Sequence, residues 1–135
     1  MARLIESSLW VDFTRLKSPP GLKAMIQPWI LDPLAAICEP VAFEVLRHAT
    51  TQERRWIEAQ FATLPLLAAP PRLWRDATLL GQQCRDRGIN AGSLDLLIAC
   101  CALHHEAELV TFDADYVAIA RAAPLRVLLL SRNIP

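Results

Sequence analysis

The chain has 135 residues and a mass of 15.1 kDa, which is the size of one domain. Hydrophobic residues make up 53% of it, and 14 basic side chains balance 14 acidic ones. This composition excludes an intrinsically disordered chain, and it excludes a strongly basic coat protein that binds nucleic acid through net charge. No apolar run reaches the roughly 18 residues that span a bilayer, and the N-terminus lacks the uninterrupted apolar stretch of a signal peptide. We therefore expect a single cytoplasmic domain covering residues 1–135.

Short apolar runs alternate with longer helical patterns along the chain, and Pro or Gly marks many of the joints. Strands are predicted at residues 2–6, 35–38, 64–68, 108–112 and 126–130. Helices are predicted at residues 8–17, 22–31, 41–49, 50–63, 71–87, 93–106 and 113–122. Because strands and helices alternate, the pattern predicts an α/β domain with a mostly parallel sheet of four or five strands.

The cysteine pattern argues against a zinc site. The chain has no Cys-x-x-Cys pair and no Cys/His spacing suited to zinc among its four cysteines, Cys38, Cys84, Cys100 and Cys101. We predict that all four are free, buried thiols that behave as small hydrophobic side chains.

Acidic residues occupy positions where an isolated charge is costly. Glu6 closes the first predicted strand, Glu44 interrupts an apolar helical segment, Asp95 begins the most apolar helix, and Asp113 directly follows a strand, with Asp115 two residues on. Open α/β sheets bind ligands beyond the carboxyl ends of their strands. Clustered carboxylates there lose solvation and repel one another.

A divalent cation would resolve this conflict. The chain has only two lysines, Lys17 and Lys23, so each carboxylate cannot have a lysine partner. Hard oxygen ligands suit Mg²⁺ or Mn²⁺, which retain waters and contact substrate phosphates. Such ions stabilise phosphoryl charge and activate water for hydrolysis.

Each carboxylate also has a simpler interpretation. Asp95 complements the positive end of a helix dipole, and Asp113 is suited to cap the helix that follows it. Glu44 has a possible ion-pair partner in Arg47, and Glu6 can be a surface residue at a strand end. The matched positions of all four favour a shared site.

Four segments in chain order resemble motifs of the PIN-domain nucleases, and of VapC-type toxins in particular. Residues 4–13, LIESSLWVDF, are similar to the family's opening, where an acidic residue ends the first strand and a Trp-Ile-Asp-like helix follows. Residues 40–46, PVAFEVL, resemble its Glu-Leu-Leu helix. Residues 93–99, SLDLLIA, match its Asp-x-x-Ile-Ala helix, and residues 109–116, LVTFDADY, match its Thr-x-Asp-x-Asp-Phe segment.

The resemblance implies a three-layer α/β/α fold and a Mg²⁺- or Mn²⁺-dependent endoribonuclease that leaves 5′-phosphate and 3′-hydroxyl ends. The implied catalytic residues are Glu6, Glu44, Asp95 and Asp113. The implied metal ligands are Glu6, Asp95, Asp113 and Asp115, and Ser8 and Thr111 match polar positions of the same pocket. The implied partners are an RNA substrate and a VapB-like antitoxin of a type II toxin–antitoxin pair, in a homodimer and toxin–antitoxin hetero-oligomer.

One departure from the family pattern concerns the first acidic position, which is usually Asp and is Glu6 here. The additional methylene moves the carboxylate, and a displacement of about 1 Å can cost catalysis about 10²-fold. A second hypothesis is therefore a PIN-fold protein that binds RNA or a protein partner without cleaving. We expect a Glu6→Asp variant to be at least as active as this chain.

Two other α/β families with acidic pockets fit less well. The pattern of response-regulator receivers includes a lysine late in the chain, but the last lysine of this chain is Lys23. Haloacid dehalogenase-like phosphatases need Asp-x-Asp at the first strand, where Glu6-Ser7-Ser8 stands.

Residues that hold RNA are harder to identify from the sequence. The arginines considered for a basic rim are Arg47, Arg54, Arg55, Arg72, Arg75, Arg85 and Arg87. The tryptophans considered for base stacking are Trp10, Trp29, Trp56 and Trp74. Trp10 and Trp74 lie beside apolar residues, which favours a place in the core or at a dimer interface.

Overall fold

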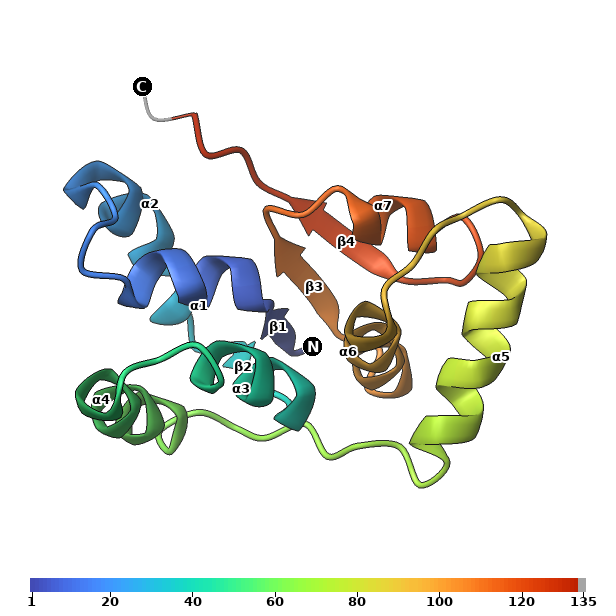
Figure 1. The fold of residues 1–135 in the computed structure, drawn as a ribbon, viewed down its shortest axis with the longest axis horizontal. Helices are drawn as coiled ribbons and strands as arrows, with labels where there is room; N and C mark the ends of the chain where they lie inside the picture. The colour runs from blue at the N-terminus through green and yellow to red at the C-terminus, as the bar shows by residue number, and fades with distance from the viewer. Residues whose placement is uncertain (134–135) are drawn as a thin grey trace.

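The computed structural model describes residues 1–133, in which four strands form one parallel sheet (Figure 1). The strands are β1 (Arg3–Ile5), β2 (Ala35–Ala36), β3 (Glu108–Thr111) and β4 (Arg126–Leu129), and their order across the sheet is β2-β1-β3-β4. Both strands adjoining β1 are parallel to it, as crossover connections through helices require. The predicted α/β class and parallel sheet are confirmed.

Helices form the connections between the strands. They are α1 (Ser7–Thr14), α2 (Pro20–Ile30), α3 (Glu39–Leu46), α4 (Thr51–Phe61), α5 (Leu73–Asp86), α6 (Ser93–His104) and α7 (Asp115–Ile119). Among residues 1–133, no helix is both long and apolar enough to cross a membrane. The capping box predicted at the start of α4 is present: the Thr50 hydroxyl accepts from the Glu53 amide, and the Glu53 carboxylate accepts from the Thr50 amide.

The central strands are covered on both faces. Successive side chains of a strand point to opposite faces, and Leu4, Ile5, Leu109 and Val110 are all fully buried. This burial makes the sheet the middle layer of the three-layer arrangement that the sequence resemblance implies. Helix α6 is also largely internal, and it packs against α3 and α5.

Two of the sequence-based element predictions need correction. Residues 64–68 were expected to form a strand but contribute only one isolated parallel bridge, between Leu66 and Ile37. Pro65 has no amide hydrogen to donate to a ladder, so pairing stops at the Ile37 contacts. The helix expected at 113–122 is limited to α7, because residues 113–114 lead into it as a turn and residues 120–122 form turns after it.

The core contains the predicted thiols and one of the predicted tryptophans. All four cysteines are free and buried. Trp10 is 1% exposed, and its ring packs edge-on against Phe61 with the centroids 4.8 Å apart. Trp74 is 75% exposed, so it is not a core residue.

The strand register determines where the polar strand ends meet. Ile5 of β1 pairs with Val110 of β3, and the Glu6 amide donates to the Val110 carbonyl at 3.0 Å. Glu6, which follows β1, and Thr111, which ends β3, are therefore neighbours in space although 105 positions separate them in the chain.

Candidate active site

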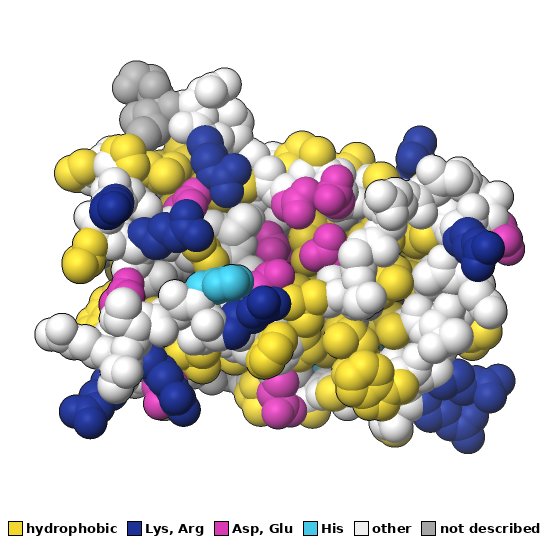
Figure 2. All heavy atoms as spheres, in the orientation of Figure 1, with side chains coloured by type: hydrophobic (Ala, Val, Ile, Leu, Met, Phe, Trp, Pro, Cys, Tyr) yellow, Lys and Arg dark blue, Asp and Glu magenta, His cyan; other side chains and the backbone are white. Residues whose placement is uncertain are grey.

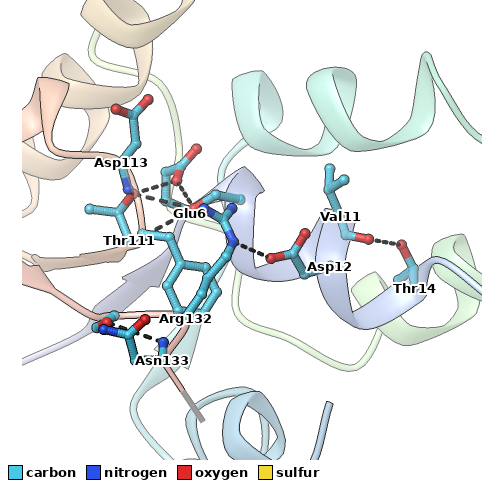
Figure 3. A network of polar contacts seen from close by, with 11 residues as sticks. Glu6, Val11, Asp12, Thr14, Thr111, Asp113, Arg132 and Asn133 are labelled. Carbon is cyan, nitrogen blue, oxygen red and sulfur yellow. Dashed lines mark hydrogen bonds and ion pairs between the residues drawn. The ribbon is translucent and has the colours of Figure 1, made fainter. Parts of the chain in front are cut away.

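A buried carboxylate held by two hydroxyl groups lies at the carboxyl ends of β1 and β3 (Figure 3). Oε1 of Glu6 accepts hydrogen bonds from Ser8 Oγ at 2.6 Å and from Thr111 Oγ1 at 2.5 Å. Glu6 is 3% exposed and Thr111 is fully buried. The two hydroxyls therefore fix the Glu6 side chain in one orientation.

The same hydroxyls also hold the segment that follows β3. Thr111 Oγ1 accepts from the Asp113 amide at 2.9 Å, and Ser8 Oγ accepts from the Phe112 amide at 3.0 Å. The sequence resemblance placed Ser8 and Thr111 only along the pocket wall. In the structure they connect the acidic residue after β1 with the acidic segment after β3.

Three further carboxylates form a close cluster beside this network. One oxygen from each of Asp95, Asp113 and Asp115 lies within 4.8 Å of the others. The Tyr116 hydroxyl donates to Asp95 Oδ1 at 3.0 Å, and the Asp115 amide donates to Asp113 Oδ1 at 2.9 Å. Asp95 projects from the first turn of α6, so two separate elements supply the cluster.

A cleft of about 330 Å³ brings the four expected catalytic side chains together. Its lining includes Glu6, Glu44, Asp95 and Asp113. Figure 2 shows acidic side chains gathered in the middle of this face, with basic side chains beside them on the left and others at the right edge. Asp115 belongs to the close cluster rather than to the cleft lining, and Glu6 and Glu44 lie outside the cluster but within the cleft.

Burial and mutual repulsion disfavour the charged forms of these groups. Burial raises the pKa of Glu6, against the effect of its hydroxyl donors, and the Glu44 charge adds to the increase. Burial also raises the pKa of Asp95, to which the charges of Asp113, Glu44 and Asp115 contribute. The hydrogen bond from Tyr116 acts in the opposite direction on Asp95.

The cluster has the donor chemistry of a divalent-cation site. Across residues 1–133, none of its three aspartates and neither glutamate of the cleft forms an ion pair with Arg, Lys or His. Arg47, the suggested partner of Glu44, lies over the Phe43 ring instead. Several carboxylate oxygens at short range, with no protein cation among them, are the arrangement that Mg²⁺ or Mn²⁺ favours. Asp113 is not the helix cap suggested for it, because Ala114 is the N-cap of α7 and, within residues 1–133, no side chain caps that helix. The Asp113 carboxylate instead accepts the Asp115 amide in the turn before α7.

Comparison with known proteins identifies the family to which this arrangement belongs. The PIN domain family model matches residues 4–122. The chain belongs to the PIN-domain family. Two VapC proteins, VapC ribonuclease Mb1587 of Mycobacterium bovis and ribonuclease VapC11 of Mycobacterium tuberculosis, are each 32% identical to it over 129 residues, which cover 91% of this chain and 95% of the relative. This PIN domain is thus a VapC-type member, as its motifs indicated.

Solved structures show the same fold at lower sequence identity. The VapBC2 structure from Rickettsia felis, bound to a promoter DNA fragment, matches with a TM-score of 0.76 at 18% identity, covering 97% of this chain and 100% of that chain. DNA-bound VapBC from Salmonella typhimurium matches with a TM-score of 0.74 at 13% identity, covering 95% and 97%.

Several residues of the cleft had no functional assignment from the sequence. Asp12, which its position on a polar helix face suggested to be solvated, lines the cleft and pairs with Arg132. Arg15 and His48 line it as well, whereas none of the seven arginines considered for a basic rim does. No local motif marks these positions, because they converge from the end of α1, the end of α3 and the C-terminal segment.

Metal binding to this PIN domain is expected to raise its melting temperature more at pH 8 than at pH 5. Because the folded-state pKa values of Glu6 and Asp95 are raised, the metal-free folded state retains protons that the unfolded chain has lost. The contribution of these two groups to stability is therefore present at low pH and is lost as pH rises from about 4 through the folded pKa values. A cation reverses that loss by compensating the ionised carboxylates. Thermal unfolding in Mn²⁺ and in EDTA at both pH values measures the effect, and equal shifts at both would contradict it.

Proposed function

We propose that this PIN domain is a Mg²⁺- or Mn²⁺-dependent endoribonuclease that hydrolyses RNA phosphodiester bonds. The observation that carries the proposal is the close cluster of Asp95, Asp113 and Asp115 without a protein cation, in contact with a cleft that also contains Glu6 and Glu44. The relatives at 32% identity are named ribonucleases, and this supports RNA as the substrate.

The chain's own residues supply a preorganised acidic surface. Asp95, Asp113 and Asp115 would hold the cation, with Glu6 and Glu44 facing the same cleft. When bound, the ion stabilises negative charge on the phosphate and lowers the pKa of a coordinated water.

Hydrogen bonds keep these carboxylates from rearranging. Ser8 and Thr111 fix Glu6, and Tyr116 fixes Asp95. Carboxylates locked in this way need little reorganisation during the reaction, which is how preorganised charge contributes to catalysis.

We also propose that the protein is the toxin of a VapBC-like pair, with a VapB-like antitoxin as its partner, and that it forms homodimers and toxin–antitoxin hetero-oligomers. The support comes from structures of the same fold, several of which are VapBC structures. Purification of the chain with the product of an adjacent small reading frame, followed by measurement of the complex mass, tests this partner.

RNA cleavage by the purified protein tests the activity directly. We expect structured RNA to be cut with Mn²⁺ or Mg²⁺, to give 5′-phosphate and 3′-hydroxyl ends, and to remain intact in EDTA. Cleavage that persists in EDTA would refute the metal dependence. Absence of cleavage together with a metal-induced thermal shift would favour the second candidate function, a PIN-fold protein that binds RNA or a protein partner without cutting.

The glutamate at the first acidic position is the observation that favours this second candidate. A Glu6→Asp variant is expected to cleave at least as fast as the unmodified chain, because it restores the carboxylate position that is usual in the family. Both proteins are compared in the same Mn²⁺ assay. Clearly slower cleavage by Glu6→Asp would show that the Ser8 and Thr111 hydroxyls require the longer side chain. Cleavage by the variant alone would identify this chain as the non-cutting form.

A further inference from the structure

One arginine beside the acidic cleft is held in place from two sides. After β4 the chain remains attached to the sheet, because the Leu130 amide donates to the Thr111 carbonyl at 2.8 Å. Arg132 then turns toward the cleft, where its Nε donates to Asp12 Oδ2 at 2.6 Å (Figure 3). Its guanidinium carbon lies 4.6 Å from the centroid of the Phe112 ring.

The two partners differ in their exposure. The Asp12 side chain is 14% exposed, whereas the Arg132 side chain is 52% exposed. Asp12 accepts the hydrogen bond from Nε of Arg132, and within residues 1–133 neither Nη nitrogen donates a hydrogen bond to the protein. One edge of the guanidinium is therefore anchored, and the edge that carries the Nη donors is left for a ligand.

The surroundings of Arg132 define the ligand. Arg132 lines the same cleft as Glu6 and Asp113, and Arg15 and His48 line it too. The chain has a formal net charge of +0, so attraction of a polyanion depends on local cations rather than on an overall field. A planar guanidinium with free donors matches phosphate oxygens in a way that a lysine ammonium does not.

We propose that Arg132 is a substrate-binding residue that holds a phosphate of the RNA strand next to the scissile one, and that Asp12 is the positioning residue that orients it. The inference rests on the proposed nuclease function. It adds that Arg132 sets which RNA phosphate lies at the acidic cluster. An arginine held by an aspartate and an aromatic ring loses less conformational freedom on binding than a free surface arginine.

Binding of a fluorescein-labelled RNA oligonucleotide, measured by anisotropy in EDTA over a salt series, tests the proposal without relying on catalysis. Arg132→Ala is expected to weaken binding about tenfold, the loss typical of a charge-assisted hydrogen bond. It should also reduce the slope of log K against log salt by about 0.7, the value for one phosphate contact on a single strand.

Matched variants separate phosphate binding from general charge and from anchoring of the chain end. Arg126→Ala removes an exposed arginine at the opposite end of β4, and it should leave the slope unchanged. Arg132→Lys should retain the slope of log K against log salt but bind RNA more weakly than the unmodified chain. Lysine keeps the positive charge but lacks the planar pair of N–H donors of the guanidinium. Asp12→Asn should weaken RNA binding without changing the slope of log K against log salt.

The cleavage assay gives a second readout. In Mn²⁺, Arg132→Ala should raise KM more than it lowers kcat.

Three results would overturn the proposal. Unchanged RNA binding by Arg132→Ala, together with a lower melting temperature, would assign Arg132 to anchoring of the C-terminal segment and leave the nuclease function standing. Equal losses for Arg126→Ala and Arg132→Ala would show general electrostatic attraction. An unmodified protein that neither binds nor cuts RNA would overturn this inference together with the proposed function.

Discussion

Asp95→Asn is expected to reduce metal-dependent RNA cleavage by about 10²- to 10³-fold, the loss typical when one preorganised electrostatic group is removed from an active site. Asp95 belongs to the close carboxylate cluster and faces the cleft. The Tyr116 hydroxyl can still donate to the side-chain oxygen of an asparagine, so the local structure should persist. Initial rates in Mn²⁺, at matched protein concentration, measure the loss.

The same substitution is expected to raise the melting temperature in EDTA. Burial and the charges of Asp113, Glu44 and Asp115 raise the pKa of Asp95, so the ionised side chain destabilises the metal-free fold at neutral pH. An asparagine removes that charge. A protein that loses activity while gaining stability has lost a functional group rather than its fold.

Asp76→Asn is the matched control for Asp95→Asn. Asp76 stands in the first turn of α5 as Asp95 stands in the first turn of α6, so both substitutions remove the same favourable interaction with a helix dipole. Asp76 does not line the acidic cleft, and its substitution should leave cleavage unchanged. Equal activity in the two variants would remove Asp95 from the active site.

Thr111→Val is expected to lower the free energy of unfolding by about 2–4 kcal/mol, since it leaves the part-buried Asp113 amide and the buried Glu6 carboxylate each short of a hydrogen bond. The hydroxyl donates to Glu6 and accepts from the Asp113 amide, and the side chain is fully buried. Valine keeps nearly the same shape without the oxygen. Because both acidic partners lose their anchor, cleavage should fall about 10- to 100-fold. Chemical denaturation and initial cleavage rates measure the two effects.

Thr111→Ser tests whether the hydroxyl or the methyl group matters. Serine retains both hydrogen bonds and loses one buried methyl, which costs about 1 kcal/mol. We expect it to retain most of the activity. If serine and valine variants were equally inactive, packing of the methyl group would matter more than the hydrogen bonds to Glu6 and Asp113.

Local sequence patterns were sufficient for most elements and misleading for two. Continuous apolar runs predicted β1 and β3, because strands buried on both faces show no alternation. The run at 126–130 predicted β4 as well, although this edge strand is only partly buried. The run at 64–68 has the same character, but Pro65 interrupts it, and only one bridge to Ile37 forms. The pattern at 113–122 is helical, yet turns at residues 113–114 and 120–122 limit the helix to α7.

The candidate site could be predicted in part because its residues stand at strand ends and in motifs. Glu6 directly follows β1, Asp113 stands two residues after the end of β3, and neighbouring parallel strands end at one edge of a sheet. The contact between Asp12 and Arg132 had no such signal. The two residues are 120 positions apart, and either one alone resembles a solvated charge.

The sequence by itself determined the α/β class and marked the acidic residues at costly positions, because burial of a strand and the cost of an isolated charge are local properties. The PIN-type order of motifs came from the resemblance to the family. Only the tertiary structure decided which carboxylate oxygens lie close together, which hydroxyls orient Glu6, and which arginines line the cleft. Those relations depend on strand register and on the path of the chain after β4. Both are set by packing between residues far apart in the chain, and no local pattern records that packing.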